Sequence, residues 1–445
     1  MALFVVYLSH AVTVRSGGVG MMVAGTRGVA IPGRPSAQDE SQFLADPRGF
    51  CVDCCGQSGP VFATGAFGDA VFVGGGEATD AVSEAGERVP GPLREPFGPL
   101  TSSAADGRSA FDSACGPFND ECYAALFQWV PLFKETGGFS TFRFDDFLDP
   151  RVRKALPAMR RVIFRATSPA LLGCKLEDLP AAPGLESPKD WGTAYAEYAA
   201  EKMKPISGGF GLPFKLPVLG GGAPSLESAL GAERAAEALA AVEPTAALLT
   251  SMLTMAQAHP EWDARLVAEQ KQALTGIKPE VGIDSAILDA MPLLQAFALE
   301  TLRMHPPARP DRLRLTRAVE VEGGVTLPAG TLVAPEPFVG HFFASVYDQP
   351  TAFNPDRFVG DAAAPAPALG LPGGAGSRGA AARELTLLVT KMAFVHMRRM
   401  HDVKLPLDRP AISGYPLWAI ADSVELKATP YMYYELQRGV RKLKF

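Results

Sequence analysis

The chain lacks cysteine in its larger, C-terminal part: the last of its six cysteines is Cys174, although the chain has 445 residues. So few cysteines exclude the disulfide framework of a small secreted domain. Charged residues are also scarce, at 20% of the chain, against about 25% in typical domains. Acidic residues outnumber basic ones, 48 to 42, and no basic stretch is interleaved with aromatic residues. The sequence therefore predicts no nucleic-acid partner.

The N-terminal segment lacks both a full membrane span and acidic residues. Residues 1–14 are uncharged and mostly apolar, but a bilayer-spanning helix needs about 20 such residues. Up to Ala37 the segment contains arginines but neither aspartate nor glutamate, a composition that favours an organelle-targeting segment. A membrane-associating anchor and a poorly ordered terminus are the alternatives. We expect residues 1–45 to stand apart from the folded domain, and whether residues 1–38 are cleaved stays open.

Apolar residues recur with helical spacing along most of the remaining chain. The segments that predict helices are 121–134, 150–166, 191–204, 225–258, 261–275, 283–304 and 380–399. Segment 225–258 would form about 50 Å of helix, capped by Ser225 and kinked at Pro244; two helices broken at Pro244 are the alternative. Residues 70–73 predict a strand, and the β-branched runs between residues 304 and 340 predict a hairpin. The predicted fold class is mainly α with a small β region.

A Cys-x-x-Cys spacing occurs at Cys51 and Cys54, with Cys55 adjacent. Cysteines at this spacing can bind zinc or carry out redox chemistry, but a structural zinc site normally takes a second close pair. Cys115 and Cys122 are candidate second contributors, and they lie seven positions apart. Free thiols are therefore favoured over a metal site, and no metal is predicted.

Several motifs follow one another in the C-terminal half of the chain. Glu300 and Arg303 lie three residues apart on one predicted helical face, and His305-Pro306-Pro307 ends that helix. Pro355-Asp356-Arg357-Phe358 comes next, and Gly374-Ala375-Gly376-Ser377-Arg378 then opens the helix over residues 380–399. The order and spacing of these segments resemble the cytochrome P450 superfamily, over about residues 59–429.

The resemblance implies a cytochrome P450-like fold with a buried ionic triad. In that family the Glu-x-x-Arg pair and the arginine of a later Pro-Glu-Arg-Phe segment lie together beneath the haem, and the matching residues are Glu300, Arg303 and Arg357. Removing one member of such a triad would leave an unpaired buried charge, at a cost of about 3–5 kcal/mol. These three are expected to be folding residues, and no catalytic residue is predicted.

The family's haem loop reads Phe-Gly-x-Gly-x-Arg-x-Cys-x-Gly, and the resemblance places Gly374, Gly376 and Arg378 on its glycines and its arginine. Ala380 then stands where the family has the cysteine that binds the haem iron. An alanine methyl has no lone pair for iron, and the thiolate is what favours O–O cleavage. The next histidine, His396, lies about 24 Å further along the predicted helix. We therefore expect haem-thiolate chemistry to be lost.

The central helix departs from the family in a second way. The family's oxygen-activating segment, Ala/Gly-Gly-x-Asp/Glu-Thr-Thr, resembles residues 240–245. Glu243 takes the acidic position, Pro244 stands where the principal threonine belongs, and Thr245 is displaced by about 100° around the helix. The hydroxyl that would steer protons to bound oxygen is therefore missing.

The bases that hold the haem propionates in the family are matched only in part. Arg314, with Arg312 and Arg317, lies where the family's strand after the Glu-x-x-Arg helix offers an arginine. A solvated basic strand or an interface patch is the alternative. The early helix that supplies another base resembles residues 108–118, which contain no base beyond Arg108. If haem is retained, Arg314, Gly374, Gly376 and Arg378 are the expected contacts.

Loss of the principal threonine also occurs in the allene oxide synthase and hydroperoxide lyase branch, whose plastid enzymes rearrange fatty-acid hydroperoxides and still use the thiolate. Residues 207–219 loosely resemble that branch. We predict a pseudoenzyme that serves as a scaffold or accessory subunit of a larger organellar complex. The alternative is a haem-dependent oxidoreductase or hydroperoxide-rearranging lyase with a non-thiolate haem.

The remaining expectations concern cofactors, partners and boundaries. No cofactor is expected, unless haem is bound without a cysteine ligand. Protein partners are expected, together with a lipid or hydrophobic small molecule in the interior or contact with a membrane. The plastid is favoured over the mitochondrion as the location. The predicted domains are an N-terminal segment over residues 1–45, a cytochrome P450-like domain over 46–430 and a basic tail over 431–445.

Overall fold

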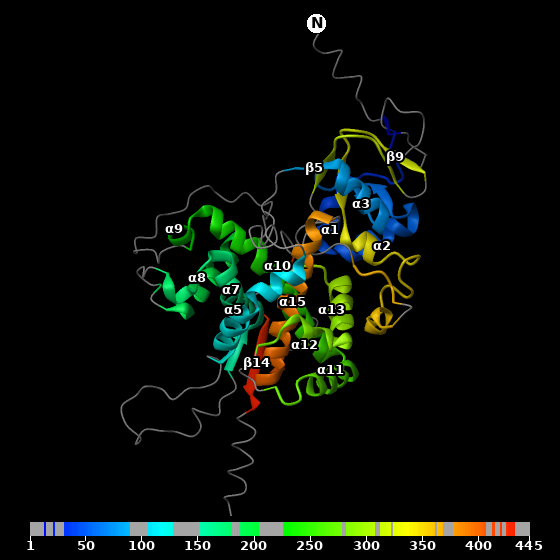
Figure 1. Cartoon of the computed structure of the whole chain (residues 1–445). Helices are drawn as coiled ribbons and strands as arrows, with labels where there is room; N and C mark the ends of the chain where they lie inside the picture. The colour runs from blue at the N-terminus through cyan, green and yellow to red at the C-terminus, as the bar shows by residue number, and fades with distance from the viewer. Residues whose placement is uncertain are drawn as a thin grey trace, which may run out of the picture. The chain divides into compact units, whose positions relative to one another are not determined.

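The structure is a computed structural model of the chain. It describes residues 13–14, 21–22, 31–89, 106–127, 151–179, 185, 187–203, 226–277, 282–307, 312–321, 324–360, 363–367, 377–405, 412–413, 419–420 and 424–431. These residues form two compact units, one from residues 1–92 and 299–380 and the other from 93–298 and 381–445. The described residues are mainly helical with small sheets (Figure 1), so the predicted fold class is confirmed.

A five-stranded sheet organises the first unit. Its order is β3-β4-β10-β7-β5, with β10 parallel to β4 and the other neighbours antiparallel. Along the middle of β7 the burial alternates, so Leu313 and Leu315 face the core while Arg314 is exposed, as the period-2 geometry of a strand requires. The bounds are β3 Val61–Ala63, β4 Val71–Val73, β5 Gly86–Arg88, β7 Leu313–Leu315 and β10 Leu332–Pro335.

Short helices and a hairpin complete the first unit. The hairpin of β8 and β9 forms within the segment predicted for it, and α3 packs on β8 and on the five-stranded sheet. Phe43 of α1 is fully buried and meets the rings of Phe50, Phe67 and Phe72 edge-on. The bounds are α1 Asp39–Ala45, α2 Pro47–Ser58, α3 Gly76–Ala85, α14 Pro337–His341, the 3₁₀ helix η4 Pro355–Phe358, β8 Val319–Val321 and β9 Val325–Leu327.

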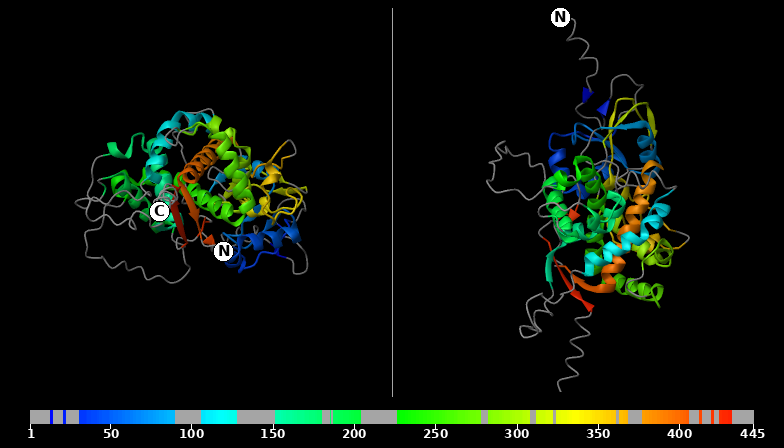
Figure 2. Two further views of the ribbon diagram at one scale, coloured as in Figure 1. Left: turned by 90° about the horizontal axis from the view of Figure 1, so that it is seen from below. Right: turned by 60° about the vertical axis from the view of Figure 1, so that its left-hand side comes forward.

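Long helices form the second unit. Helix α7 packs against α5, α8 and α10, and Figures 1 and 2 show these helices from three directions. A three-stranded antiparallel sheet, in the order β11-β14-β6, pairs strands that lie far apart in the sequence. The bounds are α5 Gly107–Phe127, α7 Ala155–Leu172, α8 Pro188–Lys202, α9 Leu226–Leu230, α10 Ala232–Ala258, α11 Pro260–Ala273, α12 Ser285–Asp289, β6 Arg151–Lys154, β11 His401–Lys404 and β14 Glu425–Pro430.

Two helices belong to both units. Helix α13, Pro292–Met304, crosses the boundary between residues 298 and 299, and α15, Ser377–Met400, crosses the boundary between residues 380 and 381. Five short elements complete the assignment of the described residues: the strand pairs Thr13–Val14 with Met21–Met22 and Ile412–Ser413 with Ala419–Ile420, and the 3₁₀ helix η3 Leu176–Asp178.

None of the predicted helices has the same bounds in the structure, and four differ clearly. The expected helix over 121–134 contains only the end of α5, which begins at Gly107. The expected helix over 225–258 is two helices, but the break lies at Gly231, whose φ of 85° suits glycine, and not at Pro244 inside α10. The expected helix over 283–304 is likewise α12 and α13, because Pro292 begins the second helix. The start of segment 150–166 is strand β6, because it pairs with β14. The expected cap Ser225 lies outside the described residues.

Helix α10 is the only described helix whose length and composition would allow it to cross a membrane. In the most apolar 18-residue window of this helix, 89% of the residues are buried inside the structure. A helix that is apolar on all sides is expected when protein surrounds it. The length and composition of α10 therefore fit the central core helix that the sequence predicted.

Candidate functional site

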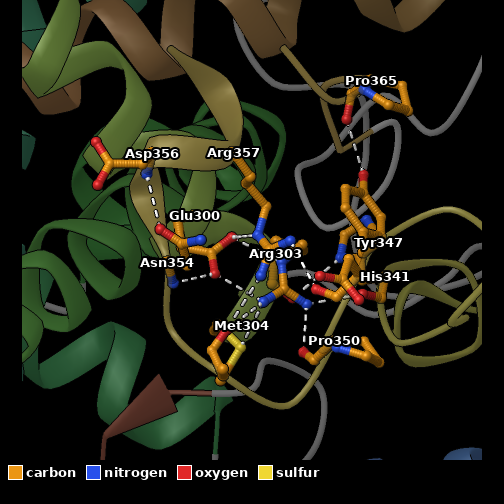
Figure 3. A network of polar contacts seen from close by, with 12 residues as sticks. Glu300, Arg303, Met304, His341, Tyr347, Pro350, Asn354, Asp356, Arg357 and Pro365 are labelled. Atoms are coloured by element: carbon orange, nitrogen blue, oxygen red, sulfur yellow. Dashed lines mark hydrogen bonds and ion pairs between the residues drawn. The ribbon is translucent and has the colours of Figure 1, made fainter. Parts of the chain in front are cut away.

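The three predicted triad residues lie together in the first unit. Glu300 and Arg303 project from α13, and both are fully buried. Arg303 binds both carboxylate oxygens of Glu300, with Nε donating to Oε2 and Nη2 donating to Oε1, each at 2.7 Å. Arg357 of η4 forms an ion pair with the same carboxylate, with Nε 3.2 Å from Oε2. Figure 3 shows the two guanidinium groups converging on Glu300.

Backbone groups of residues 341–354 complete this network (Figure 3). Nη1 of Arg303 donates to the carbonyl oxygens of His341, at 2.9 Å, and Pro350, at 2.7 Å. The backbone N–H of Asn354 donates to Oε1 of Glu300 at 2.7 Å. A buried charge is tolerated when such bonds replace its water. The triad therefore fixes the path of the irregular segment after α14, which is a structural task.

Aromatic rings and neutral histidines surround the Arg303 guanidinium. Its Cζ lies 5.3 Å from the ring centroid of Phe342 and 5.2 Å from that of Tyr347, within cation–π range. Burial, with a further contribution from Arg303, lowers the pKa of His341 to about 3. Burial raises the pKa of Tyr347 to about 12. His341 and Tyr347 therefore stay uncharged near neutral pH, and the charges of the cluster belong to the triad.

The expected haem contacts are only partly within the described residues. Gly374 and Gly376 lie outside them. Arg378 lies in the first turn of α15, but its side chain is outside the described part. Ala380 is exposed in the same turn. At the predicted ligand position the side chain is therefore a methyl group with no donor atom, which does not fit a haem that needs an axial thiolate.

Arg314 is held within its own sheet. It lies opposite Glu87 in the register of β7 with β5, and its Nη1 donates to the carbonyl oxygen of Gly330 at 3.0 Å. These contacts match the solvated-strand alternative better than the propionate role. His396, set aside above as a ligand, is buried in α15, where its Nε2 lies 2.6 Å from Oδ1 of Asn119.

Glu243, the acid at the oxygen-activation position, lies in a buried ion pair. Nη2 of Arg160, on α7, lies 2.9 Å from its Oε2, and Nε of Arg160 lies 3.0 Å from both carboxylate oxygens. The hydroxyl of Tyr195, on α8, donates to Oε1 of Glu243 at 3.0 Å. Only 3% of the Arg160 side chain and 2% of the Glu243 side chain are exposed. The carboxylate therefore joins three helices, and both of its oxygens already accept hydrogen bonds.

Pro244 and Thr245 follow on the same buried stretch of α10. Pro244 has no N–H to donate to the carbonyl of Ala240, so one helical hydrogen bond is absent there. The hydroxyl of Thr245 donates to the carbonyl of Ala241 at 2.8 Å, back along its own helix. Such back-bonding occupies the hydroxyl proton. No hydroxyl is thus offered at the position where the family uses its threonine.

Arg108 is also paired with protein groups. It binds Asp289 of α12 through both terminal nitrogens, one of them at 3.0 Å from Oδ1, and its Nε lies 3.9 Å from Glu384 of α15. Next to it, Gly107 touches the start of α15 so closely that a Cβ would lie 2.3 Å from the carbonyl oxygen of Ala381. The beginning of α5 therefore packs tightly on α15 at Ala381, the residue that follows Ala380.

The cysteines of α2 do not form a metal site. All six cysteines are free thiols. Among the residues that the structure describes, no three histidine, cysteine or acidic side chains are placed to hold a metal ion. Burial raises the pKa of Cys54 to about 11 and that of Cys55 to about 12. Both therefore remain protonated at neutral pH and are poor nucleophiles.

Sequence reasoning missed Arg160 and Tyr195, the partners of Glu243. One signal for them was available. Glu243 is the only charged residue between Ala238 and Ala258, and a lone acid in a buried helix requires a partner. The sequence does not reveal which base on another helix supplies it.

Comparisons with known proteins agree with this fold. Residues 234–412 match the family model described as cytochrome P450. The structure titled "Retinoic acid bound cyanobacterial CYP120A1" has a TM-score of 0.59 and 19% identity, over 88% of this chain and 96% of that one. A mutant heme domain of cytochrome P450DA has a TM-score of 0.62 and 16% identity, over 90% of this chain and 97% of that one.

Curated relatives match over shorter segments. Cyclooctat-9-en-7-ol 5-monooxygenase from Streptomyces melanosporofaciens is 31% identical over 125 residues, which are 28% of this chain and 26% of that protein. The mitochondrial 25-hydroxyvitamin D-1 alpha hydroxylase from Rattus norvegicus is 30% identical over 168 residues, 37% of this chain and 32% of that protein. The matched segments thus span a third or less of these relatives. Residues 234–412 are thus similar to the cytochrome P450 family, and the chain shares the fold of solved cytochrome P450 structures.

Proposed function

We propose that this chain is a cytochrome P450-like pseudoenzyme that has lost haem-thiolate monooxygenase chemistry and serves as a scaffold or accessory subunit of a larger assembly. The observation that carries the proposal is Ala380 at the ligand position, in a chain with no cysteine beyond Cys174. The relatives named above are called a monooxygenase and a hydroxylase. Their chemistry requires an electron-donating axial ligand, and this chain has none at that position.

The central helix supports the same proposal independently. An acid that delivers protons must exchange them with a path to the reacting atoms. The Glu243 carboxylate instead binds Arg160 and Tyr195 within the core of the second unit. Pro244 replaces the threonine that would act beside it. The proton-relay position is therefore adapted to packing, and the ligand position has no donor atom.

The retained triad supports a role that depends on the fold itself. Glu300, Arg303 and Arg357 keep their full set of contacts although no thiolate follows them in sequence. This triad stabilises the fold, so its presence is expected in a protein whose function depends on being folded. A scaffold or accessory subunit needs the folded body without iron chemistry, and its partner is proposed to be protein, with a lipid-like molecule or a membrane as a further contact.

The proposed location is an organelle, with the plastid favoured. The support is the composition of residues 1–37, which contain arginines and no acidic residue, as organelle-targeting segments do. The loose resemblance of residues 207–219 to plastid enzymes points in the same direction. A fusion of residues 1–45 to a fluorescent reporter tests this part, and a reporter that stays in the cytosol would contradict it.

The absorbance spectrum of the purified full chain tests the loss of haem chemistry. We expect no Soret band and no stoichiometric iron, including after incubation with haemin. A Soret band with one iron per chain would contradict the proposal and favour the alternative, a haem-dependent oxidoreductase or hydroperoxide-rearranging lyase. In that case the carbon monoxide complex of the reduced protein distinguishes a thiolate ligand, by its red-shifted band, from any other ligand.

Two matched variants make this experiment sharper. Ala380→Cys restores a thiol at the ligand position, and Ala380→Ser has the same shape without a soft donor. If only the vacant ligand prevents binding, Ala380→Cys takes up haem and Ala380→Ser does not, which would restrict the loss to one atom. The accessory-subunit role is tested separately by tagging the full chain in its native cells. Copurification at fixed stoichiometry supports that role, and a monomer in every extract contradicts it.

A further inference from the structure

Lys391 is a buried cation without an acidic hydrogen-bond partner among the described residues. It lies in the middle of α15, and only 4% of the residue is exposed. Its Nζ donates to Oε1 of Gln295, on α13, at 2.6 Å. A buried ammonium group is normally paired with a carboxylate, because its desolvation is costly. Here the partner is a neutral amide.

The acidic groups near Lys391 are committed to another base. The charged residues that influence Lys391 are Asp289 on α12, Glu384 on α15 and Arg108 on α5, while α13 contributes the neutral Gln295. Arg108 binds Asp289 through two nitrogens and lies 3.9 Å from Glu384. Its positive charge cancels much of the attraction that these acids would offer. Lys391 is thus left with the cost of burial and little compensation.

The position of Lys391 gives its charge a structural consequence. Helices α13 and α15 both run through a boundary between the two compact units. Within the second unit the Lys391–Gln295 hydrogen bond joins these two helices, and Gln295 lies three residues before the α13 boundary. The contact therefore ties α13 to α15 within the second unit.

We propose that Lys391 is a pH-responsive group between α13 and α15, and that the packing of these two helices is more stable when the lysine loses its proton. The neutral amine still has an N–H to donate to Oε1 of Gln295, so the hydrogen bond persists. Only the charged form of the Lys391 side chain incurs the free-energy cost of desolvation. This pH response does not depend on whether the chain binds haem. It is therefore tested independently of the proposed function.

The direction of the effect follows from proton linkage. Burial lowers the pKa of Lys391 from 10.5 to about 8, so the unfolded chain binds this proton more tightly than the folded chain. Stability therefore rises with pH between about 8 and 10.5. Applied to these two values, linkage gives an increase in the folding constant of about twofold from pH 7 to 8 and about tenfold from pH 7 to 9.

Native-state hydrogen exchange of the full chain tests the proposal. The protection factors of α13 and α15 peptides are measured from pH 7 to 9 in the wild type and in Lys391→Met. The quantity followed is the protection factor of the wild type divided by that of the variant. The ratio cancels the opposite effect of the thiols, which ionise in the unfolded chain near the upper end of this range. We expect the ratio to rise about tenfold from pH 7 to 9.

Two further variants decide between a specific and a general effect. Lys271→Met removes an exposed lysine of α11, and its ratio to the wild type should stay constant. Gln295→Glu gives Lys391 an anionic partner and raises its pKa, so the wild type should gain protection relative to this variant as the pH rises. This variant keeps the test open if Lys391→Met folds poorly. A flat ratio for both Lys391→Met and Gln295→Glu, or an equal rise for Lys271→Met, would overturn the proposal.

Discussion

Removing either member of the buried pair Arg160–Glu243 is predicted to destabilise the protein strongly. Replacing Glu243 by leucine leaves a guanidinium that is 3% exposed without its carboxylate, and it also leaves the Tyr195 hydroxyl without its acceptor. Breaking a buried pair costs about 3–5 kcal/mol. Glu243→Leu also removes the hydrogen bond that the Tyr195 hydroxyl donates to the carboxylate, whereas Arg160→Met keeps that bond. We therefore expect Glu243→Leu to be the more harmful variant.

A double-mutant cycle measures the coupling between the two side chains. Urea unfolding at pH 7 gives the free energy of unfolding of the wild type, of each single variant and of Arg160→Met with Glu243→Leu together. The double variant leaves no unpaired charge, so it should recover about 2 kcal/mol or more relative to the sum of the single losses. A proton-delivering acid that faces a reaction site would not show this recovery, because its removal would not strand a buried arginine.

The exposed pair Lys202–Glu227 is the matched control. Its side chains are 46% and 40% exposed and its charged atoms lie 3.1 Å apart. Exposed pairs of this kind contribute about 0–1 kcal/mol, so Lys202→Met and Glu227→Leu should each cost less than about 1 kcal/mol. The reasoning fails if the buried pair behaves like the exposed one, or if the losses of the two buried substitutions simply add.

Two more predictions concern the first unit and acid stability. Arg303→Lys keeps the charge but cannot bridge both Glu300 oxygens and the surrounding carbonyls, so urea unfolding should show a loss of about 3 kcal/mol or more, whereas the exposed Arg314→Lys should change stability by less than about 0.5 kcal/mol. Burial lowers the pKa values of His341 and His396 to about 3, so the unfolded chain takes up protons first below pH 6.5. Stability should fall by about 2 kcal/mol per histidine from pH 7 to 5, and His396→Gln should lose less over that range than the wild type does.

Local patterns were sufficient to predict most helices but not their ends. The apolar spacing of residues 232–258 predicts a helix, yet the break at Gly231 depends on a single residue that adopts a positive φ. A glycine in a helical pattern is a known stop signal, but Pro244 is the stronger local signal for a break in this segment. Proline inside a long apolar helix is tolerated when its neighbours are already buried, as they are around Pro244.

Pairing between strands that lie far apart in the sequence explains why the start of the predicted helix over 150–166 is a strand. Residues 151–154 form β6 because they pair with β14, about 270 residues later in the chain, and no local signal encodes that pairing. The same limit applies to the site. The spacing of Glu300 and Arg303 is a local signal, whereas the carbonyl groups of His341, Pro350 and Ala352 that bind Arg303 are supplied by an irregular segment.

Substitutions at the predicted ligand position and in the triad differ in their effect on the free energy of folding, and this difference would make the proposed loss of haem chemistry physically easy. An exposed alanine in the first turn of α15 buries no charge, breaks no hydrogen bond and has the highest helix propensity of any residue. Exchanging a cysteine for it therefore leaves the folding free energy almost unchanged. Exchanging Glu300 or Arg303 would instead strand a fully buried charge. On the proposed function, loss of iron ligation would be nearly free for the folded state while loss of the triad would not, so a chain selected only for its shape would keep Glu300, Arg303 and Arg357 without a thiolate.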